Sequence, residues 1–125
     1  MGPAAGSAGR DRRQEVSRNG RLSPAMLERV AAQFKALAEP SRLRLMQLLQ
    51  EGEWSVSELA EKSELSFANA SKHLAMLHGA GFVVRRKAGL NVRYALADES
   101  TRELCELMCA RIRDRAAAEH KSVRG

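Results

Sequence analysis

The residues of this chain best suited to specific recognition lie in the segment SFANASKHLAML, residues 66–77. Helical spacing gathers its apolar side chains on one face, formed by Phe67, Ala70, Leu74 and Leu77. On the opposite face, Asn69 can form two hydrogen bonds with an adenine edge, and Lys72 can donate to guanine or to a phosphate. Side chains placed in this way read bases in the DNA major groove, so the segment predicts a recognition helix. The alternative is a surface helix whose polar side chains only contact water.

The neighbours of these two residues fit the same interpretation. Ser66 can cap the helix and reach a phosphate, and the small side chain of Ala68 permits close approach, for example to a thymine methyl group. His73 lies at the edge of the exposed face, where a contact with DNA and a packing role are both open.

Basic residues are concentrated around this helix. The chain of 125 residues has a net charge of +6, and residues 66–97 hold five basic side chains and no acid, whereas residues 51–64 hold five acids and one lysine. A positive stripe beside an acidic patch can orient a molecule on a polyanion, although a generally basic surface is the plainer interpretation. Four cations follow the helix and are predicted to contact phosphates or the minor groove: Arg85, Arg86, Lys87 and Arg93.

The pattern of apolar residues and turn signals predicts a mainly α fold with a β-hairpin. A hairpin directly after a helix-turn-helix is a wing, so the predicted fold is a winged helix-turn-helix. Ser57 and Ser66 are the predicted N-caps of the two helices of the helix-turn-helix. We predict a disordered basic tail at 1–24, one domain at 25–118 and a C-terminal tail at 119–125. The predicted helices cover residues 24–39, 40–52 and 55–65, a further helix begins at 66, and the last helix covers 99–118. The predicted strands cover residues 82–89 and 91–97.

A second group with chemical potential is the cysteine pair in ELCELMCARI, residues 103–112. Cys105 and Cys109 are four residues apart and so share one helix face, with Cβ atoms about 5–6 Å apart. A disulfide needs about 3.5–4.5 Å, so a bond within one undistorted helix is disfavoured, and forming it would strain a turn. An apolar arc surrounds the pair and is interrupted by Arg111; it consists of Leu104, Leu107, Met108, Ile112 and Ala116.

Several chemistries remain open for these thiols. They could bridge two subunits, form a polysulfide link or hold a soft ion such as arsenite, and Arg102, Arg111 and Arg113 are predicted to lower a thiol pKa. The plain alternative is that both cysteines are small buried apolar side chains.

Other function classes find little support. There is no run of eighteen apolar residues and no N-terminal apolar signal segment, so we expect a cytoplasmic protein without a membrane partner. Motifs for phosphate loops, zinc hydrolases and serine nucleophiles are absent, and His73, His78 and His120 form no recognisable catalytic group. We therefore expect neither an enzyme nor a cofactor.

The spans FKALAEPSRLRLMQLLQEG and SVSELAEKSELSFANASKHLAMLHGAGFVVRRKAGLNVRYALAD closely resemble the ArsR/SmtB family of winged-helix repressors. The resemblance extends over about residues 30–115, and its most specific part is S-x-x-x-x-S-x-H-L-x-x-L at 66–77, followed by Gly79 and Gly81. It implies a homodimer joined by the first and last helices, a palindromic operator in double-stranded DNA, and repression relieved by an inducer. The DNA-reading positions that the resemblance implies are Ser66, Ala68, Asn69, Ser71, Lys72 and His73.

The sensor sites known in this family do not transfer to the chain. Thiolate sensors carry a C-x-C where this sequence has Ser55-Val56-Ser57, and hydroxyls do not replace thiolates for soft metals. Of the zinc-sensor positions only Asp98 matches, and it is more simply an N-cap; the others carry Ser100, Arg111 and Asp114. Cys105 and Cys109 are left as the candidate sensor, with no confident metal site and an unknown inducer. A winged helix that docks on proteins is the alternative from a different class.

Overall fold

The computed structural model describes the backbone of residues 20–124 and the side chains of residues 20–121. The predicted basic tail at 1–24 therefore lies almost wholly outside the described residues. The chain divides into two units, residues 1–37 and 38–125, which are described separately. Within residues 20–124 no helix is both long enough and apolar enough to cross a membrane.

The first unit contains the helix α2 (Pro24–Leu37). Its first turn is capped by Ser23, whose hydroxyl accepts a hydrogen bond from the backbone N–H of Met26 at 3.2 Å. The helix ends two residues before the predicted end at Glu39, because a residue that precedes proline is pushed out of the helical conformation. Glu39 is accordingly extended, with φ −156° and ψ 126°, and becomes the N-cap of the next helix.

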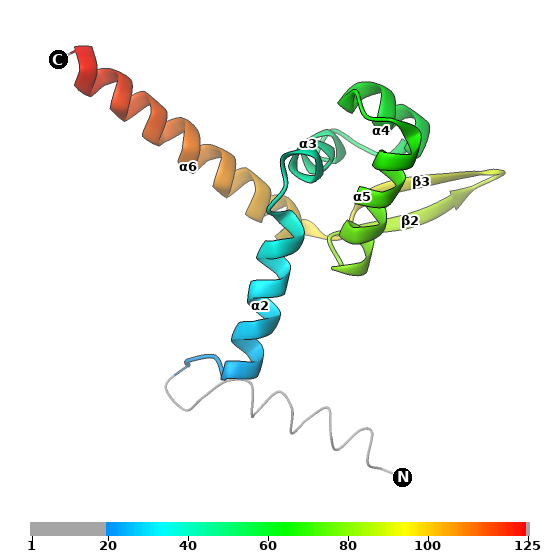
Figure 1. Cartoon of the computed structure of the whole chain (residues 1–125), viewed down its shortest axis with the longest axis horizontal. Coiled ribbons are helices and arrows are strands. Elements are labelled where there is room, and N and C mark those ends of the chain that lie inside the picture. The colour runs from blue at the N-terminus through cyan, green and yellow to red at the C-terminus, as the bar shows by residue number, and fades with distance from the viewer. Residues whose placement is uncertain (1–19, 125) are drawn as a thin grey trace, which may run out of the picture. The chain divides into compact units, whose positions relative to one another are not determined.

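The second unit confirms the predicted winged helix-turn-helix (Figure 1). It contains, in order, α3 (Pro40–Leu49), β1 (Trp54–Ser55), α4 (Val56–Ser63), α5 (Phe67–Gly79), β2 (Val83–Ala88), β3 (Asn91–Leu96) and α6 (Glu99–Arg124). Its core joins α3, α4 and α5 to the base of the hairpin, and the largest fully buried side chains are Leu45, Met46, Leu49, Leu59, Leu74, Leu77 and Val83.

The three strands form one antiparallel sheet in the order β1-β3-β2. The hairpin register pairs Ala88 with Asn91, so Gly89 and Leu90 form its two-residue turn. Gly89 has a φ of +66°, which glycine adopts without strain. The hairpin extends past α5 as a wing (Figure 1). The strand β1 has only two residues and was not predicted.

Four further sequence-based expectations need correction. The N-cap of α4 is Ser55 rather than Ser57, because Ser55 and Glu58 form a reciprocal capping box. Phe67 is 59% exposed rather than buried, because the first residue of α5 lies beyond the core that covers Leu74 and Leu77. The helix predicted over 40–52 already ends at Leu49. Finally, α6 continues past 118 to Arg124, into the predicted tail, since no glycine or proline stops it earlier.

Candidate nucleic-acid interface

The helices α4 and α5 form the helix-turn-helix that presents the candidate recognition residues. The hydroxyl of Ser55 accepts from the N–H of Glu58 at 3.1 Å, and the N–H of Ser55 donates to the Glu58 carboxylate at 2.8 Å. This second hydrogen bond holds the pKa of Glu58 below its ordinary value. The turn passes through Glu64, which is left-handed with a φ of 60°, and α5 begins directly after Ser66.

The predicted reading face of α5 is exposed. Ala68, Asn69 and Lys72 lie outside the core, while Ala70 and Leu74 on the opposite face are fully buried. Ser71 is half-buried at the boundary between the two faces. The division between the faces thus follows the helical spacing of the sequence, apart from Phe67.

Ser66 caps α5 as predicted. Its hydroxyl oxygen accepts a hydrogen bond from the backbone N–H of Asn69 at 3.1 Å. A serine hydroxyl also carries one proton that it can donate, and the cap does not use that proton. Ser66 can therefore cap the helix and donate to a phosphate at the same time.

His73 lies against α3 rather than among the exposed residues. Its Nδ1 is 3.3 Å from Nη1 of Arg42, and its Nε2 is 3.9 Å from Oε1 of Glu39. Nη1 of Arg42 also contacts the sulfur of Met76 at 3.3 Å. Of the two roles open for His73, the structure shows the packing contact.

The four cations of the wing fall on two faces of the hairpin. Neighbouring residues of a strand point to opposite faces, so Arg85 and Lys87 share the face of Val83, whereas Arg86 shares the other face with its register partner Arg93. Arg85 and Lys87 are exposed.

Arg86 and Arg93 both contact Glu53, which precedes β1, and Arg93 also contacts Glu58 in the first turn of α4. Nη2 of Arg86 lies 3.1 Å from the Glu53 carboxylate. Arg93 donates from Nη2 to the backbone oxygen of Glu53 at 2.8 Å and lies 3.9 Å and 3.7 Å from the carboxylates of Glu53 and Glu58. The sequence did not reveal these partners, since they come from a segment about forty residues away.

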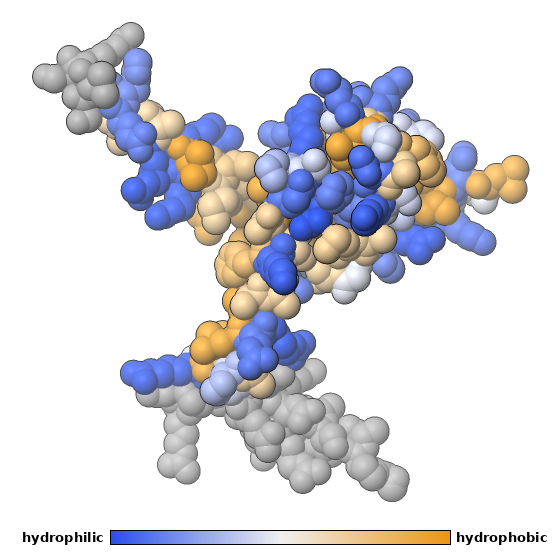
Figure 2. All heavy atoms as spheres, viewed as in Figure 1, coloured by the Kyte–Doolittle hydropathy of each residue, from blue (hydrophilic) through white to orange (hydrophobic). Residues whose placement is uncertain are grey.

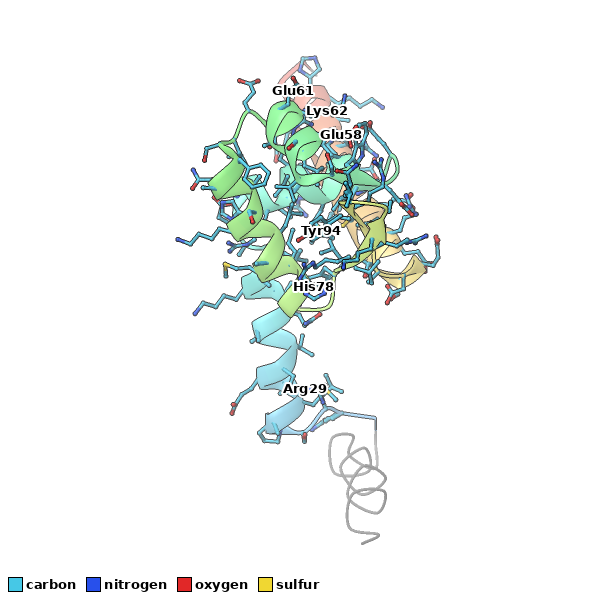
Figure 3. All side chains as sticks on the ribbon, turned by 90° about the vertical axis from the view of Figure 1, so that its right-hand side faces the viewer. Arg29, Glu58, Glu61, Lys62, His78 and Tyr94 are labelled. Carbon is cyan, nitrogen blue, oxygen red and sulfur yellow. The ribbon has the colours of Figure 1, made fainter. Side chains whose placement is uncertain are left out.

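Two of the five acids between residues 51 and 64, Glu58 and Glu61, lie on α4. Figure 3 shows Glu58, Glu61 and Lys62 near one end of α5, with His78 toward the other end. The ammonium group of Lys62 lies 4.7 Å from the centre of the Trp54 ring. The Trp54 ring N–H donates to the backbone oxygen of Leu48 at 2.9 Å, which ties β1 to α3.

Both cysteines are free thiols, half-buried on α6. Burial raises the pKa of Cys105, and this outweighs the hydrogen bond to Gln50 and the charge of Arg102, which act in the opposite direction. Arg102 therefore acts on Cys105 in the expected direction, but burial has the larger effect and the pKa of this thiol is raised overall. Arg102 also donates to the backbone oxygen of Gln50 at 2.7 Å.

Asp98, the one residue that matches a zinc-sensor position, serves as a helix cap. The Asp98 carboxylate accepts from the N–H of Thr101 at 2.8 Å, from its hydroxyl at 2.7 Å and from the hydroxyl of Ser100 at 2.9 Å, which confirms Asp98 as the cap of α6. These hydrogen bonds lower the pKa of Asp98. Over the part of the chain that the structure describes, no three His, Cys, Asp or Glu side chains are placed to hold a metal ion.

Beyond its first turns, α6 has little cover from the rest of its unit. Leu107 is 69% exposed, and Met108 and Ile112 are also exposed. Figure 2 shows apolar surface on α6 beside hydrophilic side chains. Apolar side chains grouped in this way on a helix suit a further contact.

Comparison with known proteins identifies the class of this interface. The family model described as bacterial regulatory protein, arsR family, matches residues 39–84, which include α4, α5 and the start of β2. A relative named as a probable mercury resistance operon repressor, from Streptomyces lividans, is 36% identical over 85 residues, which cover 68% of each chain. The chain belongs to the arsR family.

Solved structures agree with this assignment. A homodimeric winged helix-turn-helix DNA-binding domain from Mycobacterium bovis superposes with a TM-score of 0.69 at 32% identity, covering 72% of this chain and 83% of that one. Reduced HlyU from Vibrio cholerae superposes with a TM-score of 0.62 at 33% identity, covering 67% and 88%. The chain is thus a DNA-binding transcriptional repressor of the arsR family and not an enzyme.

Proposed function

We propose that this arsR-family protein binds a palindromic operator as a homodimer and is released from it by a change at its cysteines. The proposed DNA binding rests on the exposed face of α5, where the small side chain of Ala68 lies beside Asn69 and Lys72 near the start of the helix. Residues near the N-terminus of a recognition helix are those that reach base edges.

Each proposed contact follows from the chemistry of the side chain. Asn69 reads adenine with two hydrogen bonds, and Lys72 donates to guanine or a phosphate. Ser66 and Ser71 donate to phosphates, while Ala68 permits close approach of the helix. On the wing, Arg85, Arg86 and Lys87 contact phosphates or the minor groove.

The homodimer is supported by exposed apolar surface on two helices. In the second unit α6 exposes Leu107, Met108 and Ile112, and in the first unit α2 exposes Leu27 and Phe34. A second copy related by a two-fold axis would cover such faces and present two recognition helices to the two halves of a palindrome. The Mycobacterium bovis relative is a homodimer.

The release step is proposed to act on Cys105 and Cys109. Their spacing of four residues does not suit a disulfide within an intact helix, so oxidation to a disulfide would distort α6 or join two subunits. A polysulfide link with added sulfur is longer and would span the gap between the two thiols on the face proposed to meet the second subunit. Either change would alter the proposed dimer contact. Burial raises the pKa of Cys105 in the single chain, so less of this thiol is present as the reactive thiolate than for an exposed cysteine.

A thiophilic metal or metalloid is the second candidate signal. It is favoured by the Streptomyces lividans relative, which is named for mercury resistance. One chain supplies two thiols on α6, and two chains would supply four, which is enough for a soft ion such as arsenite or mercury.

The test is fluorescence anisotropy of the reduced protein on DNA from its own upstream region. The measurement is repeated after treatment with an oxidant, a polysulfide and arsenite, and then with dithiothreitol. Binding that one treatment abolishes and dithiothreitol restores would support the thiol switch and identify its signal. The double variant Cys105→Ser, Cys109→Ser should bind DNA as the wild type does but ignore the signal; normal release of this variant would refute the switch.

A winged helix that docks on proteins is the remaining alternative. Operator binding should weaken steeply as salt rises and should prefer the palindrome over its scrambled sequence. Weak binding to both sequences would favour the docking module.

A further inference from the structure

Two arginines of the wing stand directly opposite each other. Arg86 on β2 pairs in register with Arg93 on β3, so both side chains point to the same face of the sheet. Like charges in this position destabilise a hairpin unless a counter-charge lies beside them. The short strand β1 brings a counter-charge to this face, because Ser55 pairs with Arg93 and places the residues before β1 beside the two arginines.

Glu53 and Glu58 are those counter-charges. Glu53 binds Arg86 through its carboxylate at 3.1 Å and Arg93 through its backbone oxygen at 2.8 Å. Glu58 lies 3.7 Å from Nη2 of Arg93 while it also accepts from the N–H of Ser55 in the capping box. The guanidinium of Arg93 is therefore directed toward the start of α4.

The two arginines also differ in how far their side chains are exposed to solvent. The side chain of Arg93 is 34% exposed, whereas that of Arg86 is 65% exposed. Arg86 contacts a single carboxylate, that of Glu53, and keeps donors that can turn to a phosphate. Arg93 makes contacts with three acceptor groups on two residues, and a phosphate would have to replace them.

We propose that Arg93 is a positioning residue that fixes the wing on the helix-turn-helix and makes no phosphate contact. This inference rests on the proposed function, in which the wing and α5 bind one operator together. Arg93 joins β3 to the residue before β1 and to the capping box of α4. The anchor therefore sets the angle between the wing and the two helices, so that Arg85 and Lys87 reach the backbone while α5 occupies the groove.

The salt dependence of DNA binding distinguishes a phosphate contact from a positioning role. Each phosphate contact adds about 0.9 to the slope of log K against log salt, and a homodimer carries every contact twice. Arg85→Gln and Lys87→Gln, which remove exposed cations of the same hairpin, should each lower the slope by about 1.8. Arg93→Gln should leave the slope unchanged while it weakens binding about five- to thirtyfold. A slope that falls by as much as in Arg85→Gln would overturn the proposal.

The DNA affinities of a charge-conserving variant of Arg93 and of a double variant provide a second readout. Arg93→Lys keeps the charge but not the planar fork, so it should recover only part of the affinity. Glu58→Gln, which keeps a side-chain acceptor for the capping box, should cost little more once Arg93→Gln is present, because both changes remove the charge pair between Arg93 and Glu58. Glu61→Gln removes the same charge from α4 away from the anchor and is the matched control. Additive effects of Glu58→Gln and Arg93→Gln would contradict the proposal.

Hydrogen exchange tests the anchor without DNA. In the full-length protein, Arg93→Gln should speed amide exchange in β3 and in the first turn of α4, whereas Arg85→Gln should not. If the wild-type protein binds no palindrome but Arg93→Gln still loosens these amides, the proposed function fails and the anchor stands. Unchanged exchange in Arg93→Gln would show that no anchor exists.

Discussion

The guanidinium of Arg42 on α3 lies 3.3 Å from Nδ1 of His73 on α5. This contact joins two helices through residues that are 31 positions apart in the sequence. A guanidinium only donates hydrogen bonds, so Nδ1 is the accepting nitrogen and the ring proton is on Nε2, which faces Glu39. Arg42 is only 9% exposed, and its charge is therefore held by protein acceptors rather than by water. His73 is one of those acceptors and belongs to the support of the recognition helix.

His73→Ala should consequently lower stability as well as DNA binding. Removing an acceptor from a nearly buried cation costs about 1–3 kcal/mol. Lys72→Ala changes the adjacent exposed residue and should leave stability within about 0.5 kcal/mol of the wild type. Urea unfolding of both variants measures this difference. Equal stability of His73→Ala and the wild type would return His73 to the list of candidate DNA contacts.

Asn69 and Lys72 should differ in what they contribute to binding. Asn69→Ala should lose about 1–3 kcal/mol of discrimination at one base pair, because a two-bond contact to adenine is lost. Lys72→Ala, if its partner is a phosphate, should instead weaken binding to all sequences alike and reduce the salt slope.

Competition binding against a set of single-base operator variants measures both effects. An Asn69→Ala protein that keeps the wild-type preference at every position would exclude Asn69 from base reading.

The sequence predicted those parts of the fold that depend on local pattern. The exposed and buried faces of α5 follow from helical spacing, and the hairpin follows from turn residues between two β-rich runs. The capping box of α4 also had a local signal, since Ser55 and Glu58 stand three residues apart, but Ser57 was the predicted cap. Each of these features needs information from fewer than twenty neighbouring residues.

Contacts between distant segments could not be predicted in this way. β1 is two residues long and exists because Trp54 pairs with Tyr94, and the same pairing brings Glu53 to Arg93. A net positive stretch in the sequence therefore does not reveal which of its cations already have partners in the fold. The arginine that binds His73 comes from α3, whose role in the site had no sequence signal.

Ser66 allows the cap of α5 and the phosphate contact to be separated. Ser66→Ala should lose about 1 kcal/mol of stability and also weaken DNA binding, because it removes both the acceptor and the donor. Ser66→Asp should keep the cap, since aspartate is among the preferred N-cap residues, but its charge should repel the phosphate. Ser66→Asn is the neutral control.

Thermal unfolding and anisotropy together decide this prediction. The expected result is near wild-type stability for both capping variants, with much weaker DNA binding in Ser66→Asp than in Ser66→Asn. Similar binding by the two variants would mean that no phosphate lies beside Ser66.

The cap of α6 should make this helix sensitive to acid. The hydroxyl and N–H of Thr101 and the hydroxyl of Ser100 donate to Asp98 and lower its pKa in the folded protein. A carboxyl group with a lowered folded pKa contributes stability that is present above its unfolded pKa, about 3.9, and is lost as pH falls through the folded value. The first turn of α6 should therefore loosen at acidic pH but not between pH values of about 5 and 8.

Asp98→Asn isolates this contribution, because asparagine can also cap a helix but does not titrate. The variant should show a shallower fall in unfolding free energy below about pH 4 than the wild type. Glu103→Gln, on an exposed position of the same helix, serves as the control and should keep the wild-type slope. Since Cys105 lies only two turns from this cap, loss of the cap should also increase the rate at which Cys105 reacts with a thiol reagent. Identical acid profiles for Asp98→Asn and the wild type would show that the Asp98 hydrogen bonds do not stabilise the folded state.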